Sequence, residues 1–177
     1  MRTIKKIIKK TIGVLFLVLL IIGGVIGYKG YERYKEVLEK VPLQEKIAEI
    51  RQKPSYTEIE DLPQIYLDAV VAVEDKRFYH HPGIDPISIA RAVRNDIRAR
   101  ALIEGGSTIT QQLAKNLYFG QEQSLNRKVA EGMLALKLEW NYTKEEILEL
   151  YVNSIYFGDG YYCVEEATVI SENCRRK

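Results

Sequence analysis

The sequence contains little of several things on which whole protein classes depend. Only 2 of its 177 residues are cysteine, too few for a small domain held together by disulfides. It has one long apolar run rather than several, which excludes a polytopic membrane protein. With 46% apolar and 28% charged residues it is not a disordered chain. Internal repeats, low-complexity tracts and alternating strand patterns of useful length are missing, which leaves a mainly α-helical domain.

Charge is distributed unevenly, although the formal net charge is only +2. Residues 1–10 contain five basic residues and no acidic one, and the rest of the chain carries 21 basic and 24 acidic residues. A chain with an acidic body is a poor general nucleic-acid binder, so we expect no nucleic-acid partner.

The apolar run, residues 11–28, predicts a single transmembrane anchor. It contains 18 uncharged residues, which as a helix would span roughly 27 Å, close to the thickness of the hydrocarbon layer. The basic tail before it favours a cytoplasmic N-terminus, with everything after the run outside. A cleaved signal peptide is the alternative; the length of the run and the lack of an A-x-A site favour the uncleaved anchor.

After the anchor, residues 29–55 mix charges with sparse apolar positions and are typical of a stalk or juxtamembrane helix, broken near Pro42. Residues 56–177 show helical periodicity and predict one mainly α domain. Five helix starts are indicated by capping residues, two of them complete capping boxes: Asp61 with Pro63, Asp85 with Pro86, Thr108 with Gln111, Ser124, and Thr143 with Glu146.

The first predicted helix is apolar until it reaches Glu74 and Asp75. A carboxylate beside a buried face is partly desolvated, which raises its pKa and suits it to acid–base chemistry. The alternative is that both are solvated or pair with Lys76 and Arg77.

Two histidines and two aromatic residues follow. His80 and His81 are adjacent and cannot share a helical face, so a surface or hydrogen-bonding role is favoured over a metal pair. Phe78 and Tyr79 are more typical of packing than of a ligand site.

The segment GGSTITQQLAKN places two glycines before a helix N-terminus, where free amides and the helix dipole suit an anionic or sugar-phosphate ligand. Lys115 adds a cation. An ordinary capped surface helix explains the pattern equally well. The candidate donors are Ser107, Thr108, Thr110, Gln111 and Gln112.

Arg127, Lys128 and Glu131 share one face of the next helix, because they are spaced at i, i+1 and i+4. They form either a solvated ion-pair face or a second carboxylate among cations that hold a phosphate. Asn153, at the end of the last predicted helix, is either a polar cap or a site residue.

Four segments together resemble the motifs of the peptidoglycan glycosyltransferases, glycosyltransferase family 51. They occur in family order across about residues 62–160: AVEDKRFYHHPGID (E-D-x-x-F-x-x-H-x-G), GGSTITQQLAKN, RKVAEGMLALKLE (R-K-x-x-E) and TKEEILELYVNSIYFG. The family includes monofunctional transglycosylases and the N-terminal domains of class A penicillin-binding proteins.

The resemblance implies a lysozyme-like, mainly α transglycosylase domain, with a head and a membrane-embedded jaw, preceded by one transmembrane helix. It implies an inverting hexosyltransferase of cell-wall biosynthesis, which polymerises lipid II into β-1,4 glycan strands and releases undecaprenyl pyrophosphate. Glu74 matches the catalytic base and Glu131 the second carboxylate. Substrate-binding positions are matched by Asp75, Phe78, His81, Gly83, Ser107, Thr108, Gln111, Gln112, Lys115, Asn116, Arg127, Lys128 and Asn153.

The resemblance also bears on cofactors, partners and location. No cofactor is required, although a divalent cation, Mg²⁺ or Mn²⁺, could share the work at Glu131. The expected partners are lipid II, the nascent glycan strand, the membrane and other cell-wall synthesis proteins. The expected location is the cell membrane, single-pass, with the catalytic domain extracytoplasmic.

The resemblance ends after YFGDGYY, where the family usually continues to Y-F-G-K and this chain reads CVEEATVISENCRRK. We therefore expect a domain that is incomplete at its C-terminus. Cys163 and Cys174 would lie outside the membrane, either as a disulfide or, with more weight, as free thiols. The alternative functions are a catalytically impaired remnant that binds lipid II or cell-wall partners, and a lysozyme-like hydrolase, which gives the anchor no role.

Overall fold

A computed structural model describes residues 2–101, 105–120, 122 and 124–155, and within these ranges every regular element is a helix. The prediction of a mainly α fold is confirmed. In chain order the elements are α1 (Arg2–Lys40), α2 (Leu43–Arg51), η1 (Ile59–Asp61), α3 (Gln64–Glu74), η2 (Phe78–His80), α4 (Pro86–Ala99), α5 (Ile109–Tyr118), α6 (Leu125–Asn141) and α7 (Lys144–Val152).

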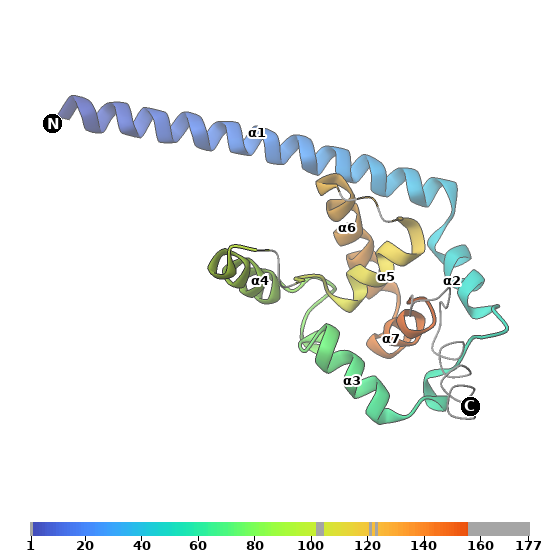
Figure 1. Ribbon diagram of the computed structural model, residues 1–177. Coiled ribbons are helices and arrows are strands. Elements are labelled where there is room, and N and C mark those ends of the chain that lie inside the picture. The colour runs from blue at the N-terminus through green and yellow to red at the C-terminus, as the bar shows by residue number, and fades with distance from the viewer. Residues whose placement is uncertain (1, 102–104, 121, 123, 156–177) are drawn as a thin grey trace.

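Helix α1 runs without interruption from the basic tail through the apolar run and on to Lys40 (Figure 1). The stretch Lys6–Lys40 contains a window with a mean hydropathy of 2.5, none of which is buried, so it is long and apolar enough to cross a membrane. The expected break near Pro42 is confirmed, because α1 ends at Lys40 and Pro42 is the N-cap of α2.

Helix α5 lies at the centre of the fold and packs against both α6 and α7. Its apolar side chains are buried because they meet apolar faces of both neighbours, and this burial is the main source of stability. The core also includes Leu43, Ile47 and Ile50 of α2, and the last turns of α1 pack against it through Tyr34, Val37 and Leu38. From the central helices the core consists chiefly of Ile109, Leu113, Leu117, Ala130, Leu134, Leu138, Ile147, Leu148 and Leu150.

Four of the five predicted helix starts are confirmed by the side-chain hydrogen bonds that cap them. Asp85 and Ser124 cap α4 and α6, and complete capping boxes start α5 at Thr108 and α7 at Thr143. The predicted cap at Asp61 is wrong: Asp61 lies in the short turn η1, and α3 begins only after Pro63.

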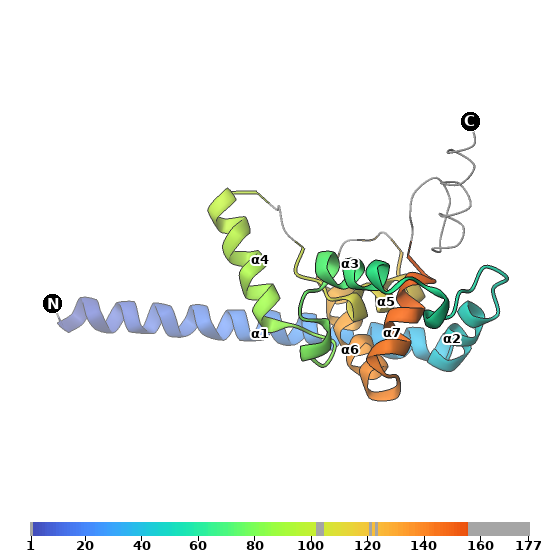
Figure 2. The same cartoon turned by 90° about the horizontal axis from the view of Figure 1, so that it is seen from below.

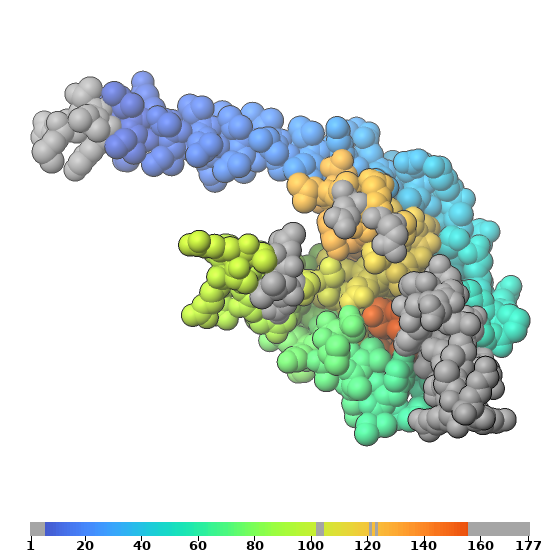
Figure 3. Space-filling model, viewed as in Figure 1, coloured from blue at the N-terminus to red at the C-terminus, as the bar shows by residue number. Residues whose placement is uncertain are grey.

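Helix α4 projects from the body on the side of the molecule along which the apolar part of α1 extends (Figures 1 and 2). Its Ile87, Val93 and Ile97 side chains are exposed. Between α1 and α4 the surface is hollowed, and α6 forms the end of the hollow (Figure 3).

The expectations about the C-terminus lie outside the described residues. These are the departure from the family pattern after YFGDGYY and the state of Cys163 and Cys174, which fall in residues 156–177.

Candidate active site

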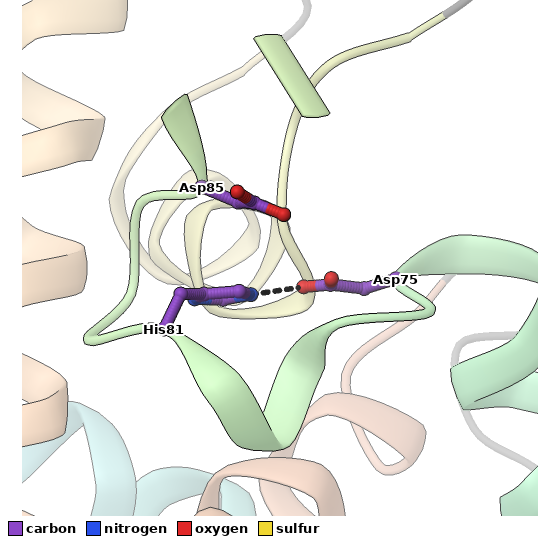
Figure 4. A group of neighbouring side chains, drawn as sticks. All are labelled: Asp75, His81 and Asp85. Carbon is purple, nitrogen blue, oxygen red and sulfur yellow. Dashed lines mark hydrogen bonds and ion pairs between the residues drawn. The ribbon is translucent and has the colours of Figure 1, made fainter. Parts of the chain in front are cut away.

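The loop that follows α3 is tied to the start of α5. Asp75 is buried, and its Oδ2 accepts a hydrogen bond from the Ile109 amide at 3.1 Å and lies 2.9 Å from Nε2 of His81. Nδ1 of His81 accepts a hydrogen bond from the Gly83 amide at 3.2 Å. The ring proton therefore sits on Nε2, which donates a hydrogen bond to Asp75. The predicted hydrogen-bonding role of His81 is confirmed (Figure 4).

Gly83 fixes this loop against α6. Its φ of 93° is in the left-handed region, and a Cβ there would lie 3.0 Å from the Ala135 carbonyl oxygen, so the position requires glycine. The Gly83 carbonyl accepts a 2.6 Å hydrogen bond from the Thr108 hydroxyl. Gly83 and Thr108, both predicted as substrate-binding, thus join the first and second motifs.

Asp85 forms a second buried anchor in the same loop. Its Oδ1 accepts a hydrogen bond from the Ile87 amide. Its Oδ2 accepts two more, from the Ser88 hydroxyl at 2.7 Å and from Nε of Arg77 at 2.9 Å. Burial alone raises the pKa of this carboxyl, but the hydrogen bonds from Ser88 and Ile87 and the charge of Arg77 outweigh it and lower the pKa to about 2.

Asp75, His81 and Asp85 place one ligand atom each within 4.8 Å of one another, as a metal site would (Figure 4). The donor atoms are already engaged: the Asp75 oxygen by His81 and a backbone amide, His81 Nδ1 by Gly83, and both Asp85 oxygens by donors. We therefore interpret this cluster as structural.

Replacing Asp85 with Ala should lower the free energy of unfolding by about 1–2 kcal/mol at pH 7, because the cap of α4 is lost. The folded-state pKa of about 2 lies below the ordinary value of about 3.9. The contribution of Asp85 is therefore present above pH 4 and lost as the pH falls through about 2. Thermal unfolding followed by circular dichroism at neutral and acidic pH checks this; Asp61→Ala, which removes a carboxylate that caps nothing, is the control, and equal losses in both variants would contradict the prediction.

The N-terminus of α5 is occupied by the protein's own side chains. The Asp75 carboxylate accepts a hydrogen bond from the Ile109 amide, and the Thr108 hydroxyl accepts one from the Gln111 amide. The Gln111 side-chain oxygen in turn accepts a hydrogen bond from the Thr108 amide. Three amides at this helix start, those of Thr108, Ile109 and Gln111, are therefore not free for an anionic ligand, because a buried carboxylate and a capping box already bind them. The helix is also central rather than a surface helix.

Glu74, the predicted base, ends α3 with an exposed side chain. The expectation that it is partly desolvated is therefore wrong: α3 buries only Leu67 fully, and Glu74 points to solvent. Its Oε2 accepts a 2.8 Å hydrogen bond from Nε2 of Gln112, whose Oε1 in turn accepts from the Tyr151 hydroxyl at 3.2 Å. Burial, together with the negative charge of Glu74, raises the pKa of Tyr151, which keeps this hydroxyl a donor.

Glu131 is fully buried on α6 between two cations. Nη1 of Arg127 lies 2.9 Å from its Oε1 and Nζ of Lys128 lies 3.0 Å from its Oε2. The predicted shared face is confirmed, and the alternative of a solvated ion-pair face is wrong for Glu131. Lys128 also donates to the Ser107 hydroxyl at 2.8 Å, so the cations reach the loop before α5.

A divalent ion at Glu131 stays a prediction, since neither oxygen of this buried carboxylate accepts a hydrogen bond within the described residues. Each of these oxygens faces a positive group, and in the described part of the chain no second carboxylate is recorded against Glu131. We therefore derive no step through a metal ion.

Several predicted site residues lie elsewhere. Phe78 is fully buried in the core beneath the Lys144 ammonium, which explains its presence without a substrate. Asn153 is buried and binds backbone groups of Thr57 and Glu149, as a structural clip. Asn116 is exposed and donates to the Ser154 carbonyl at 3.3 Å.

Lys115 is half-buried on α5, and within the described ranges it forms no ion pair. The ligand-binding role of Lys115 stays a prediction. 

A groove of about 650 Å³ opens beside the Glu131 cluster. Its polar wall residues are Lys128, Gln111 and Asp96. The rest of the wall is mostly apolar: Ile26 of α1, Ile84, Ile89, Ala92 and Val93 from the α4 region, and Val129, Met133 and Leu136 of α6. A cationic group at the edge of an apolar groove suits a ligand that has an anionic head and an apolar tail.

Sequence reasoning missed residues that act over long separations. The Tyr151 hydroxyl donates a hydrogen bond to Gln112, and the Lys144 ammonium donates to both the Glu139 carboxylate and the His81 carbonyl. Arg33 of α1 reaches Glu122 near the start of α6. Lys144 and Tyr151 both lie within the fourth motif, whereas Arg33 and Glu122 lie outside all four motifs.

The fold and this site define a helical domain in which two carboxylates, one exposed and one buried among cations, flank a central capped helix. The family model described as "Transglycosylase" matches residues 43–170, and the chain belongs to this family.

The curated relatives agree with the family. Penicillin-binding protein 1A of Aquifex aeolicus (strain VF5) is 49% identical over 119 residues, which cover 67% of this chain and 16% of that protein. Penicillin-binding protein 1F of Bacillus subtilis (strain 168) is 48% identical over 110 residues, 62% of this chain and 15% of the relative. Penicillin-binding protein 1A of Neisseria flavescens is 50% identical over 111 residues, which cover 63% of this chain and 14% of that protein. The chain thus matches only 14–16% of the length of these relatives.

Proposed function

We propose that the protein is a peptidoglycan glycosyltransferase that polymerises lipid II into β-1,4 glycan strands. The observation that carries the proposal is the buried Glu131 held by Arg127 and Lys128 at the edge of an apolar groove. Such an arrangement suits a lipid-linked pyrophosphate, because the cations can meet the phosphates while the groove takes the lipid.

In the proposed reaction the 4-hydroxyl of the acceptor GlcNAc attacks the anomeric carbon of the donor strand. The new bond joins that carbon to the acceptor oxygen, and the bond from the carbon to the pyrophosphate oxygen breaks. The acceptor proton passes to Glu74, and the electron pair leaves with undecaprenyl pyrophosphate. Attack from the face opposite the leaving group turns the α-linked donor into a β-1,4 link.

Each charged residue has a defined part in this scheme. Glu74 is exposed, so it can reach an incoming hydroxyl, and Gln112 holds one of its oxygens in place. Arg127, Lys128 and Lys115 would stabilise the charge that develops on the pyrophosphate. Glu131 keeps Arg127 and Lys128 in position.

The proposed setting is the outer face of the cell membrane. The basic tail before the apolar part of α1 favours a cytoplasmic N-terminus, which would place the domain where the substrate lipid is presented. Sharing a membrane with the substrate raises the effective concentration of both.

The test is direct. Purified full-length protein, mixed with lipid II in detergent or vesicles, should give glycan polymer that is resolved on gels and degraded by a muramidase. Binding of lipid II by well-folded protein without polymer would support the impaired remnant instead, and release of shortened glycan from added polymer would support a hydrolase.

A further inference from the structure

The end of α1 nearest the domain packs directly on the turn of α6 that carries the cation cluster. Gly30 is buried there, and a Cβ at this position would lie 2.5 Å from Cβ of Val129 and 3.1 Å from the Asn126 carbonyl oxygen. At Gly27, one turn earlier, nothing lies within 4 Å of the same atom. Because Val129 follows Lys128 and is β-branched, it cannot move aside without moving this turn of α6.

One turn after Gly30, Arg33 extends to the segment between α5 and α6. Its Nη1 and Nη2 pair with the two oxygens of Glu122 at 3.0 and 2.5 Å, in a bidentate arrangement. The guanidinium also lies 5.5 Å from the centre of the Phe119 ring. The hydrogen bond to Glu122 outweighs partial burial and raises the pKa of Arg33, and the negative charge of Glu131 adds to this effect.

The same segment holds Arg127. The Gly120 carbonyl accepts from Nη1 of Arg127 at 3.4 Å, and the Ser124 hydroxyl accepts the Arg127 amide at 3.2 Å. The hydrogen bond from Arg33 lowers the pKa of Glu122, and the charge of Arg127 contributes in the same direction. Gly120, whose carbonyl Arg127 already contacts, lies two residues before Glu122, so the Glu122 carboxylate is the neighbouring acceptor that can compete with Glu131 for Arg127 when Arg33 does not hold it.

We infer that the membrane-proximal end of α1 is a positioning element for the cation cluster: Gly30 sets the place of the α6 turn, and Arg33 holds Glu122 away from Arg127 so that Arg127 stays on Glu131. Arg33 touches no reacting group in this scheme. The inference rests on the proposed function only for its effect on catalysis; the positioning itself is a property of the fold.

Two matched pairs of variants in the full-length, membrane-reconstituted protein test this. Gly30→Ala should lower kcat for lipid II polymerisation by about tenfold, since a small misplacement of a catalytic group has effects of this order, whereas Gly27→Ala should change it less than twofold. Arg33→Gln should lower kcat about tenfold with little change in KM. Arg33→Gln combined with Glu122→Gln should recover most of the loss, because the competing carboxylate is gone.

Hydrogen exchange over residues 125–131 gives a readout that needs no activity. Exchange should be faster in Gly30→Ala and Arg33→Gln than in Gly27→Ala and the wild type, and close to wild type in the double variant. Unchanged exchange in both Gly30→Ala and Arg33→Gln overturns the inference, as does a double variant that is worse than Arg33→Gln alone. If the wild type makes no polymer, the proposed function fails, and the exchange pattern still decides the positioning.

Discussion

Glu74→Gln should reduce lipid II polymerisation by about 100-fold or more. A positioned general base contributes about 10²–10⁴ to the rate, and glutamine cannot take the acceptor proton. The substitution is nearly isosteric, and the new side-chain oxygen can still accept from Gln112, so the geometry at the end of α3 is kept. Initial rates of polymer formation measure the effect.

The control for this variant is Glu60→Gln, which removes an exposed carboxylate from η1, away from the described cluster. Both variants should keep the wild-type circular dichroism spectrum and melting midpoint, because both residues are exposed. If Glu74→Gln retains more than half of the wild-type rate, Glu74 is not the base.

Glu131→Gln should have the second large effect, on stability as well as on activity. Removing one partner of a buried ion pair costs about 3–5 kcal/mol, because the remaining charge stays buried and uncompensated. Arg127 is the residue left in this state, since Lys128 is half exposed and can turn to solvent. Polymerisation should also fall by about 100-fold, because the cations that stabilise the leaving pyrophosphate lose their fixed positions.

Thermal unfolding of the reconstituted protein, followed by circular dichroism, measures the first effect. Lys137→Gln removes a charge from the same helix at a position with no recorded ion pair in the described ranges, and it should leave the melting midpoint within about a degree or two. A midpoint for Glu131→Gln equal to that of Lys137→Gln would mean that the buried pair contributes nothing to stability.

What the sequence could predict depended on how far along the chain a contact reaches. The capping boxes at Thr108 and Thr143 span three residues, and the grouping of Arg127, Lys128 and Glu131 spans four, so helical geometry alone predicts them. Burial is a tertiary property that local spacing does not predict: Glu74, expected to be partly desolvated, is exposed, and Glu131, for which a solvated face was one alternative, is fully buried.

The contacts that complete the site join distant segments. Arg33 and Glu122 are 89 residues apart, and Asn153 and Thr57 are 96 apart. No local spacing rule connects such pairs, because they are brought together only when α1 and the segment around Thr57 pack on the finished core. The sequence alone could not decide between a cap and a site residue for Asn153, because its amide binds Thr57, which is distant along the chain.

The continuity of α1 has a consequence for the height of the site above the bilayer. Tyr28 ends the predicted span, and at a rise of about 1.5 Å per residue Gly30 lies about 3 Å and Arg33 about 7.5 Å beyond it along the helix axis. If the predicted span crosses the membrane as proposed, the turn of α6 that packs on Gly30 would lie level with the lipid headgroups. A pyrophosphate attached to a membrane lipid would then meet Arg127 and Lys128 at the depth where it already resides, and the proposed polymerase would have no need to lift its substrate out of the leaflet.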